Sequence, residues 1–133
     1  MTDIDLCTSV EDNDDVIDQT IAALDEEFYT LPSDEQVIEA MSEELSTVQD
    51  VVRYLVSMFA MHSVYVGHGT GNYWDEAIEL VQSVMFLQPP CDESTLNSRL
   101  TRRERIHIAK MAIARTKYRI PTPYLTHRAF FAG

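Results

Sequence analysis

Apolar residues recur every three or four positions along this 133-residue chain, which is the spacing of one face of an α-helix. The two clearest stripes are Ile17, Ile21, Leu24 and Phe28, and then Val48, Val51 or Val52, Leu55 and Phe59. The same spacing predicts helices over residues 15–29, 33–45, 48–62 and 74–87, and over about 17 residues from Thr101. We therefore expect an all-α fold, a small helical bundle of about four to five helices.

Capping residues and prolines predict where these helices begin and end. Capping boxes are indicated at 33–36 and 101–104, and Thr47 and Asn72 can each cap the helix that follows. The segment 120–123 contains two prolines and cannot continue a helix. We expect the apolar pieces after it to be extended, as a C-terminal extended segment or partial β-hairpin made of Tyr124-Leu125-Thr126 and Ala129-Phe130-Phe131.

Three of the four glycines fall within one pentapeptide, Gly67-His68-Gly69-Thr70-Gly71. A glycine loop between a buried strand and a helix would indicate a nucleotide cradle. Here the preceding residues have helical spacing, and the helix after the glycines ends at Pro89 with no strand behind it. The acid at a suitable distance, Glu93, lies in a predicted loop. We therefore interpret the glycines as a helix–loop–helix connection, with Asn72 capping the second helix.

Charge is distributed very unevenly along the chain. Of the 22 acids, 16 lie in residues 1–50, which contain no Lys or Arg, and nine of the ten bases lie in residues 99–128. This polarity is typical of a basic face for nucleic acid, of an acidic arm for a basic partner, or of faces that screen each other within the molecule. Because the net charge of −12 repels nucleic acid, we do not expect direct nucleic-acid binding.

The remaining composition indicates a cytoplasmic protein without a membrane segment. No apolar run approaches the roughly 18 residues of a membrane span, and the acidic N-terminus does not resemble a signal peptide. Cys7 and Cys91 are isolated thiols rather than a disulfide framework. Residues 1–13 are rich in polar residues and are expected to be disordered. We divide the chain into an acidic extension (1–32), a helical domain (33–119) and the start of a linker hairpin (120–133).

The sequence indicates no catalytic constellation and no metal site. The four histidines are scattered, and none is at metal-ligand spacing from another His or a Cys. His68 lies between two glycines that expose its ring, and a hydrogen bond to the loop backbone is the favoured role. Cys91 has no activating base nearby in the sequence, so we do not expect a nucleophile. Trp74 is expected to anchor the core, with an exposed contact for a partner protein as the alternative.

Two motifs occur in a fixed order. The first is Gly67-His68-Gly69-Thr70-x-Asn72-x-Trp74-Asp75-Glu76-Ala77. The second is Leu100-Thr101-x-x-Glu104, followed by Arg119-Ile120-Pro121-x-x-Tyr124-Leu125-Thr126 and Ala129-Phe130-Phe131. With Glu44-Leu45-x-Thr47-x-Gln49-Asp50-x-x-Arg53, they resemble the bacterial methyltransferases that modify a glutamine of ribosomal protein three of the large subunit. The resemblance covers about residues 43–133. Departures from the family pattern occur at Val66, Gly71, Tyr73, Pro123 and Phe130.

This resemblance implies the N-terminal substrate-recognition portion of an S-adenosylmethionine-dependent protein-glutamine N-methyltransferase. The family's catalytic α/β domain and its Asn-Pro-Pro-Tyr motif would follow beyond Gly133. Gln88-Pro89-Pro90-Cys91 is only superficially similar to that motif. S-adenosylmethionine is then the cofactor of the full-length parent, and this segment is expected to bind no cofactor and to be non-catalytic.

The partners implied are a basic large-subunit ribosomal protein and the parent's own catalytic domain. The candidates for contacting the substrate protein or shaping the loop are Gly67, His68, Gly69, Thr70 and Trp74. A freestanding acidic helical adaptor that binds proteins is the alternative.

Overall fold

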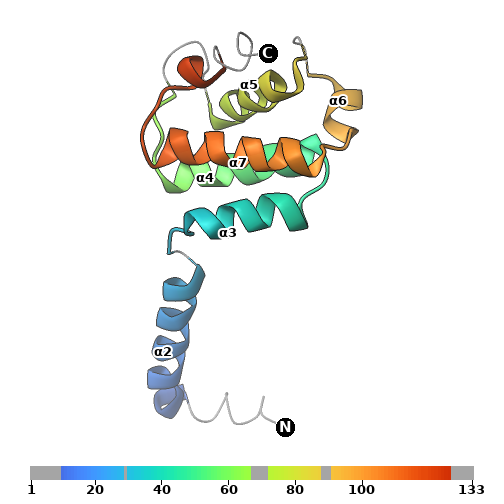
Figure 1. Cartoon of the computed structure of the whole chain (residues 1–133). Coiled ribbons are helices and arrows are strands. Elements are labelled where there is room, and N and C mark those ends of the chain that lie inside the picture. Colours follow the sequence, from blue (N-terminus) through green and yellow to red (C-terminus); the bar gives the residue numbers. More distant parts are fainter. Residues whose placement is uncertain (1–9, 29, 67–71, 88–90, 127–133) are drawn as a thin grey trace. The chain divides into compact units, whose positions relative to one another are not determined.

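The computed structural model describes residues 10–28, 30–66, 72–87 and 91–126 (Figure 1). Over these ranges the chain forms helices, turns and loops, and no β-strand beyond one isolated antiparallel bridge between Thr47 and Arg99. The prediction of an all-α fold, a small helical bundle, is confirmed. None of the helices in these ranges is long and apolar enough to cross a lipid bilayer.

The chain divides into two compact units, residues 1–31 and residues 32–133. Helix α2 (Val10–Phe28) makes up most of the described part of the first unit. It begins before residue 15, so the prediction of disorder is wrong for residues 10–13. The three-part division of the chain, with boundaries after residues 32 and 119, stays a prediction.

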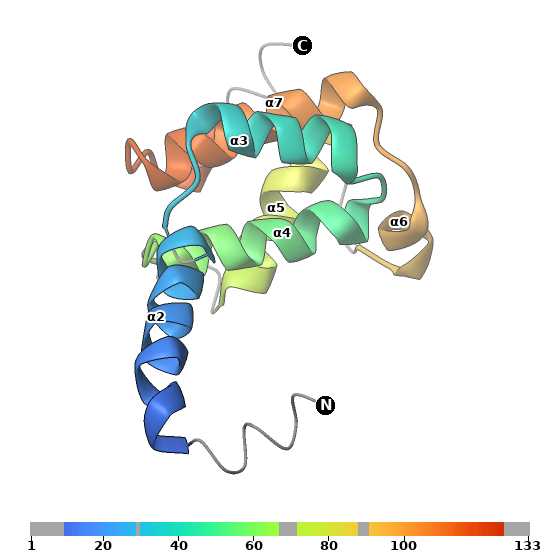
Figure 2. The same cartoon turned by 90° about the horizontal axis from the view of Figure 1, so that it is seen from below.

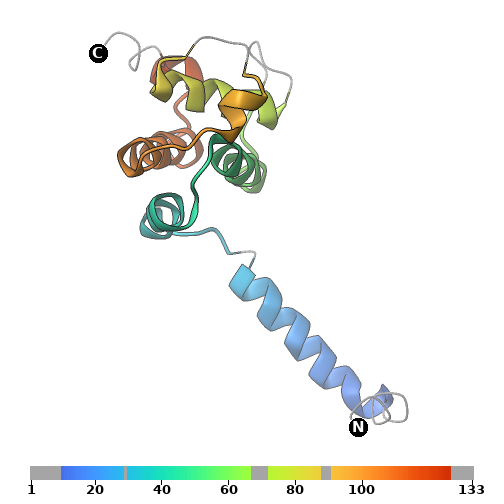
Figure 3. The same cartoon turned by 90° about the vertical axis from the view of Figure 1, so that its right-hand side faces the viewer.

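Helices of the second unit lie in three layers (Figure 2, Figure 3). Helix α3 (Asp34–Glu39) continues directly into a π-helical turn, η1 (Ala40–Glu44), and the two form the first layer. Helices α4 (Val48–Met61) and α7 (Arg102–Thr116) lie side by side in the middle layer. Helix α5 (Tyr73–Met85) covers them on the side opposite α3. The second unit is therefore a compact platform around α4 and α7.

The core lies where these layers meet. The predicted stripe of α4 is fully inside, because Val48, Val51, Val52, Leu55 and Phe59 are each at most 1% exposed. The other core residues come from α3, η1, the rest of α4, α5, α7 and the segments beside them: Val37, Met41, Met58, Val64, Ala77, Leu80, Val81, Leu100, Ile108, Ala109, Met111, Ala112 and Ile113. Ile78 and Met85 of α5 are partly buried against this core.

Helix starts follow the predicted caps. The hydroxyls of Ser33, Thr47 and Thr101 each accept a hydrogen bond from the backbone amide three residues later, at 3.2, 3.1 and 3.0 Å. All three form complete capping boxes, and Thr47, predicted only as a single cap, completes its box with Asp50. Each box satisfies two backbone donors that the helix itself leaves unpaired.

Two local predictions are wrong. Residues 122–126 are helical rather than extended, and the Tyr124 amide donates to the Pro121 carbonyl at 3.0 Å. Proline is tolerated in the first turn of a helix, where no intrahelical partner for its missing N–H is required. The segment predicted as a loop around Glu93 forms helix α6 (Glu93–Asn97), capped by Asp92. Ala129-Phe130-Phe131, the second half of the predicted hairpin, lies outside the described residues.

Candidate functional site

The glycine-rich segment, with the candidates Gly67, His68, Gly69 and Thr70, lies outside the described residues. Helix α4 ends at Met61, the described residues 62–66 after it form a turn and an irregular stretch without a strand, and α5 begins at Tyr73. The Asn72 side chain accepts a hydrogen bond from the Asp75 amide at 2.8 Å and caps α5, as predicted. A dinucleotide cradle requires a strand before its glycine loop. The described flanks therefore favour the helix–loop–helix interpretation.

A buried ion pair connects segments on both sides of the glycines. Nε of Arg115, on α7, donates to Oε2 of Glu76 at 2.8 Å, and these side chains are only 8% and 7% exposed. The same Nε lies 3.2 Å from Oγ1 of Thr122, and the Thr122 hydroxyl donates to the Glu76 carboxylate. Nη2 of Arg115 donates to the Tyr65 carbonyl. We refer to Tyr65, Glu76, Arg115 and Thr122 as the Arg115 cluster.

The Arg115 cluster joins three segments that are far apart in the sequence. Tyr65 comes just before the glycines, Glu76 lies in the first turn of α5, and Thr122 lies in the proline-containing segment after α7. A guanidinium group holds several acceptors in a fixed fork, which gives such a contact geometric specificity. The segments that precede and follow the glycines in the sequence, and the segment leaving α7, are thus held to one side chain.

A cavity of about 260 Å³ lies beside this cluster. It is lined by the Arg115 cluster together with Ser63, Arg119, Pro121 and Pro123. Ser63 and Arg119 have φ angles of 52° and 60°, in the left-handed region that disfavours residues other than glycine. Backbone strain of this kind concentrates at binding sites and switch segments. The cavity is the described feature that best fits a binding function.

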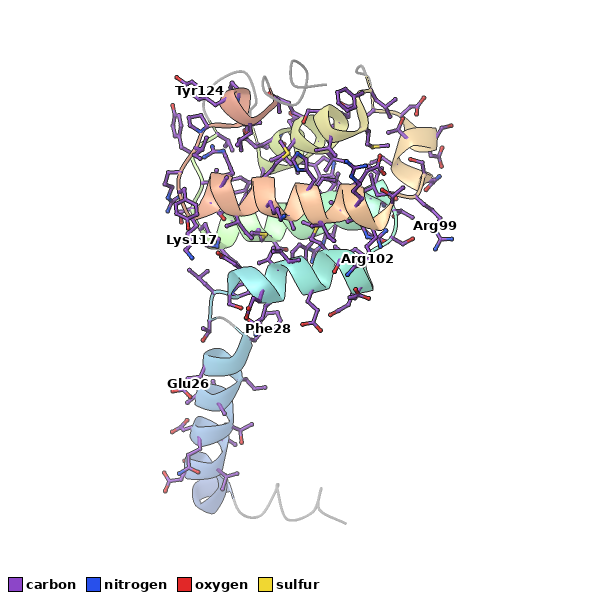
Figure 4. The ribbon with its side chains drawn as sticks, in the orientation of Figure 1. Glu26, Phe28, Arg99, Arg102, Lys117 and Tyr124 are labelled. Carbon is purple, nitrogen blue, oxygen red and sulfur yellow. The ribbon has the colours of Figure 1, made fainter. Side chains whose placement is uncertain are left out.

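Trp74 does not anchor the core. Its side chain is 39% exposed, so the core prediction is wrong. Tyr73 occupies the inward position instead, with its ring centroid 6.4 Å from that of Phe59. Tyr124, on the short helical segment after α7, projects outward and is 70% exposed (Figure 4). Exposed aromatic rings are thus present in both family motifs, at positions 74 and 124.

Several basic side chains of residues 99–119 are used within the second unit. Arg102 pairs with Glu43 at 3.1 Å, and Lys117 pairs with Asp34 at 3.3 Å, near opposite ends of α7 (Figure 4). Arg105 donates to backbone carbonyls of η1. These contacts attach α7 to the first layer. They favour the interpretation that acidic and basic side chains screen each other within the molecule over the interpretation that the basic residues form a nucleic-acid-binding surface. Exposed pairs of this type contribute at most about 1 kcal/mol each.

Two other titratable side chains considered in the sequence have shifted pKa values. Burial, and secondly the charge of Asp92, raise the pKa of the Cys91 thiol, which disfavours the nucleophilic thiolate. Burial and Arg119 lower the pKa of His62. Among the described residues, no three His, Cys, Asp or Glu side chains are grouped so that they could hold a metal ion.

Comparison with known proteins identifies relatives of this chain. The ribosomal protein uL3 glutamine methyltransferase of Francisella tularensis subsp. tularensis is 36% identical over 89 residues, which are 67% of this chain and 28% of the relative. The protein of the same name from Bordetella pertussis is 36% identical over 91 residues, 68% of this chain and 30% of the relative. The chain matches the N-terminal region of these methyltransferases. It spans less than a third of their length. No protein-family model and no solved structure matches the chain.

The resemblance inferred from the motifs is thereby confirmed. Glu76 belongs to the first motif, and Thr122 lies within the second, so the Arg115 cluster links the two motifs physically. The sequence analysis missed Arg115 as a site residue. A signal was present, because Arg115 follows the buried residues Ile108 and Ala112 at helical spacing and so falls on the buried face of α7.

Proposed function

We propose that this chain is the N-terminal substrate-recognition portion of an S-adenosylmethionine-dependent methyltransferase that modifies a glutamine side-chain amide of ribosomal protein uL3. The 36% identity to two uL3 glutamine methyltransferases is the observation that carries the proposal. Catalysis and methyl-donor binding belong to the catalytic domain of the parent protein. This segment docks the substrate protein and takes no part in the methyl transfer itself.

Charge supports a ribosomal protein as the partner. Ribosomal proteins are basic, and this chain carries a net charge of −12. Opposite charges raise the association rate, and salt weakens that effect because it screens charges over about 10 Å at 0.1 M. Binding to uL3 should therefore weaken as salt is raised. The same charge opposes binding to ribosomal RNA.

The proposed contact surface surrounds the cavity beside the Arg115 cluster. Among the described residues it includes the exposed rings of Trp74 and Tyr124. The candidates Gly67, His68, Gly69 and Thr70 come from the sequence motif alone. Exposed aromatic side chains are the residues that most often dominate protein–protein binding energy. The Arg115 cluster holds the segments that carry these rings and so fixes the positions of the rings.

A binding titration tests the proposal. Purified chain is titrated with uL3 from Francisella tularensis or Bordetella pertussis by isothermal titration calorimetry, with a basic protein of unrelated sequence as the control for charge. We expect saturable binding to uL3 that the control protein does not reproduce. Equal binding of both proteins, or no binding of uL3, would contradict the proposal.

Single substitutions then locate the surface. Trp74→Ala should weaken uL3 binding by about tenfold or more, the usual effect of truncating an interface anchor. Phe86→Ala is the matched control, because Phe86 is a 57% exposed aromatic residue immediately after the other end of α5. If Phe86→Ala weakens binding and Trp74→Ala does not, the contact surface lies elsewhere on the platform.

A further inference from the structure

Helix α2 exposes an apolar stripe along one face. Ile17, Ile21 and Leu24 follow each other at helical spacing and are 46%, 51% and 59% exposed. In a globular protein such a stripe normally faces a core. Within the first unit, taken by itself, these three aliphatic side chains in successive turns have no core to pack against, so this face needs a partner.

Charge on the same helix is of one sign. The α2 sequence contains Glu11, Asp12, Asp14, Asp15, Asp18, Asp25, Glu26 and Glu27, and no Lys or Arg. Of these, Asp14, Asp15, Asp18 and Glu26 are described as exposed, and Glu26 projects from the helix (Figure 4). Among the described side chains, exposed acids thus accompany the apolar stripe from Asp14 to Glu26.

This combination restricts what can cover the stripe. Nucleic acids and anionic lipid surfaces are negatively charged and would be repelled by α2. A second copy of α2 would bring one acidic helix against another, which opposes self-association. A protein segment that carries Lys or Arg beside apolar residues matches both features, because it covers the stripe and neutralises the acids.

We infer that α2 is a docking helix for a basic, apolar-patterned segment of the ribosomal protein substrate. The inference rests on the proposed function and adds to it a second attachment point, separate from the surface near the Arg115 cluster. Two linked attachment points bind more tightly than either alone, because the second contact forms within an already bound complex. The stripe provides apolar surface that the bound segment buries. The acidic side chains orient this segment and increase its association rate.

The test uses the full chain and three sets of substitutions. The stripe variant is Ile17→Ser, Ile21→Ser and Leu24→Ser. The charge variant is Asp14→Asn, Asp15→Asn and Asp18→Asn. The matched control places the same new side chain off the stripe, as Gln19→Ser, Ala22→Ser and Ala23→Ser. Far-UV circular dichroism of each variant compares its helix content with that of the control.

Affinity for uL3 is then measured by calorimetry at low and high salt. We expect the stripe variant to lose at least about tenfold in affinity at both salt concentrations, and the control to stay within about twofold of the wild type. The charge variant should lose affinity at low salt and show a weaker salt dependence.

Three results would overturn the inference. If the wild type binds uL3 and the stripe variant binds equally well, α2 is not a docking helix while the proposed function stands. Equal losses in the stripe variant and the control would assign the effect to helix stability instead of the stripe. A concentration-dependent dimer in sedimentation that the stripe variant abolishes would assign the stripe to self-association. If the wild type does not bind uL3 at all, the proposed function itself fails.

Discussion

Replacing Arg115 by methionine removes the cation from the Arg115 cluster while keeping a long, unbranched side chain. Three contacts are lost: the 2.8 Å contact to Glu76, the 3.2 Å contact to Thr122 and the hydrogen bond to the Tyr65 carbonyl. The Glu76 carboxylate stays where only 7% of its side chain is exposed, now without this cation. Breaking one partner of a buried pair costs about 3–5 kcal/mol, since the remaining charge is desolvated.

That cost is large relative to the stability of a small domain. Domains are typically stable by about 5–15 kcal/mol, so the variant should keep only part of its stability. For a domain of this size, about 1 kcal/mol lowers the melting temperature by roughly 4–8 °C, which predicts a fall of at least about 12 °C. The change is measured by thermal and urea unfolding, followed by far-UV circular dichroism.

A double-mutant cycle separates the buried pair from general packing. Glu76→Gln alone should also destabilise the fold, because it leaves the Arg115 cation buried without its carboxylate. The double variant Arg115→Met with Glu76→Gln should lose clearly less than the sum of the single losses, since no unpaired charge remains. Additive losses, or a loss below about 1 kcal/mol for Arg115→Met, would refute the reasoning.

Three further changes probe the caps and the core. Thr101→Ala should cost about 1 kcal/mol of unfolding free energy and Thr101→Ser much less, because only serine keeps the oxygen that accepts from the Glu104 amide at 3.0 Å. The hydrogen bond from the Thr47 amide is the main cause of the lowered pKa of Asp50. The ionised Asp50 carboxylate therefore stabilises the fold at neutral pH, and this stabilisation is lost on acidification. The difference in unfolding free energy between wild type and Asp50→Asn should shrink as pH falls through the pKa of Asp50. Gln82→Leu should stabilise the fold by about 1 kcal/mol, because the buried Gln82 amide nitrogen has no hydrogen-bond partner among the described residues, and unchanged or lower stability would contradict this.

Local signals in the sequence were enough to predict the helices of the platform. The α4 stripe and the capping residues Ser33, Thr47 and Thr101 act within a few residues, and the structure confirms them. Helix boundaries were less predictable near prolines, because a proline can either end a helix or lie in its first turn. Residues 122–126 form a helical segment despite two prolines, because the position of a proline within a helix decides whether it is tolerated.

The Arg115 cluster could not be predicted from the sequence, because its contacts join residues that are far apart in the chain. Arg115 and Glu76 are 39 residues apart, and an Arg near the end of a helix is ordinarily explained by the helix dipole. We predicted Trp74 in the core because tryptophan usually buries a large area. In the structure the inward position belongs to Tyr73, one residue earlier in the helix. The family motifs indicated a candidate region, and only the folded arrangement identified the side chain that joins them.

Amide hydrogen exchange of the chain, alone and with uL3, tests the central claim most directly. We expect uL3 to protect residues 72–76 and 119–126, beside the Arg115 cluster, and the backbone of α2 between residues 14 and 28. Protection confined to α6 or to the α3–η1 layer, or an exchange pattern that uL3 leaves unchanged, would contradict the claim that this chain is a docking platform for the ribosomal protein.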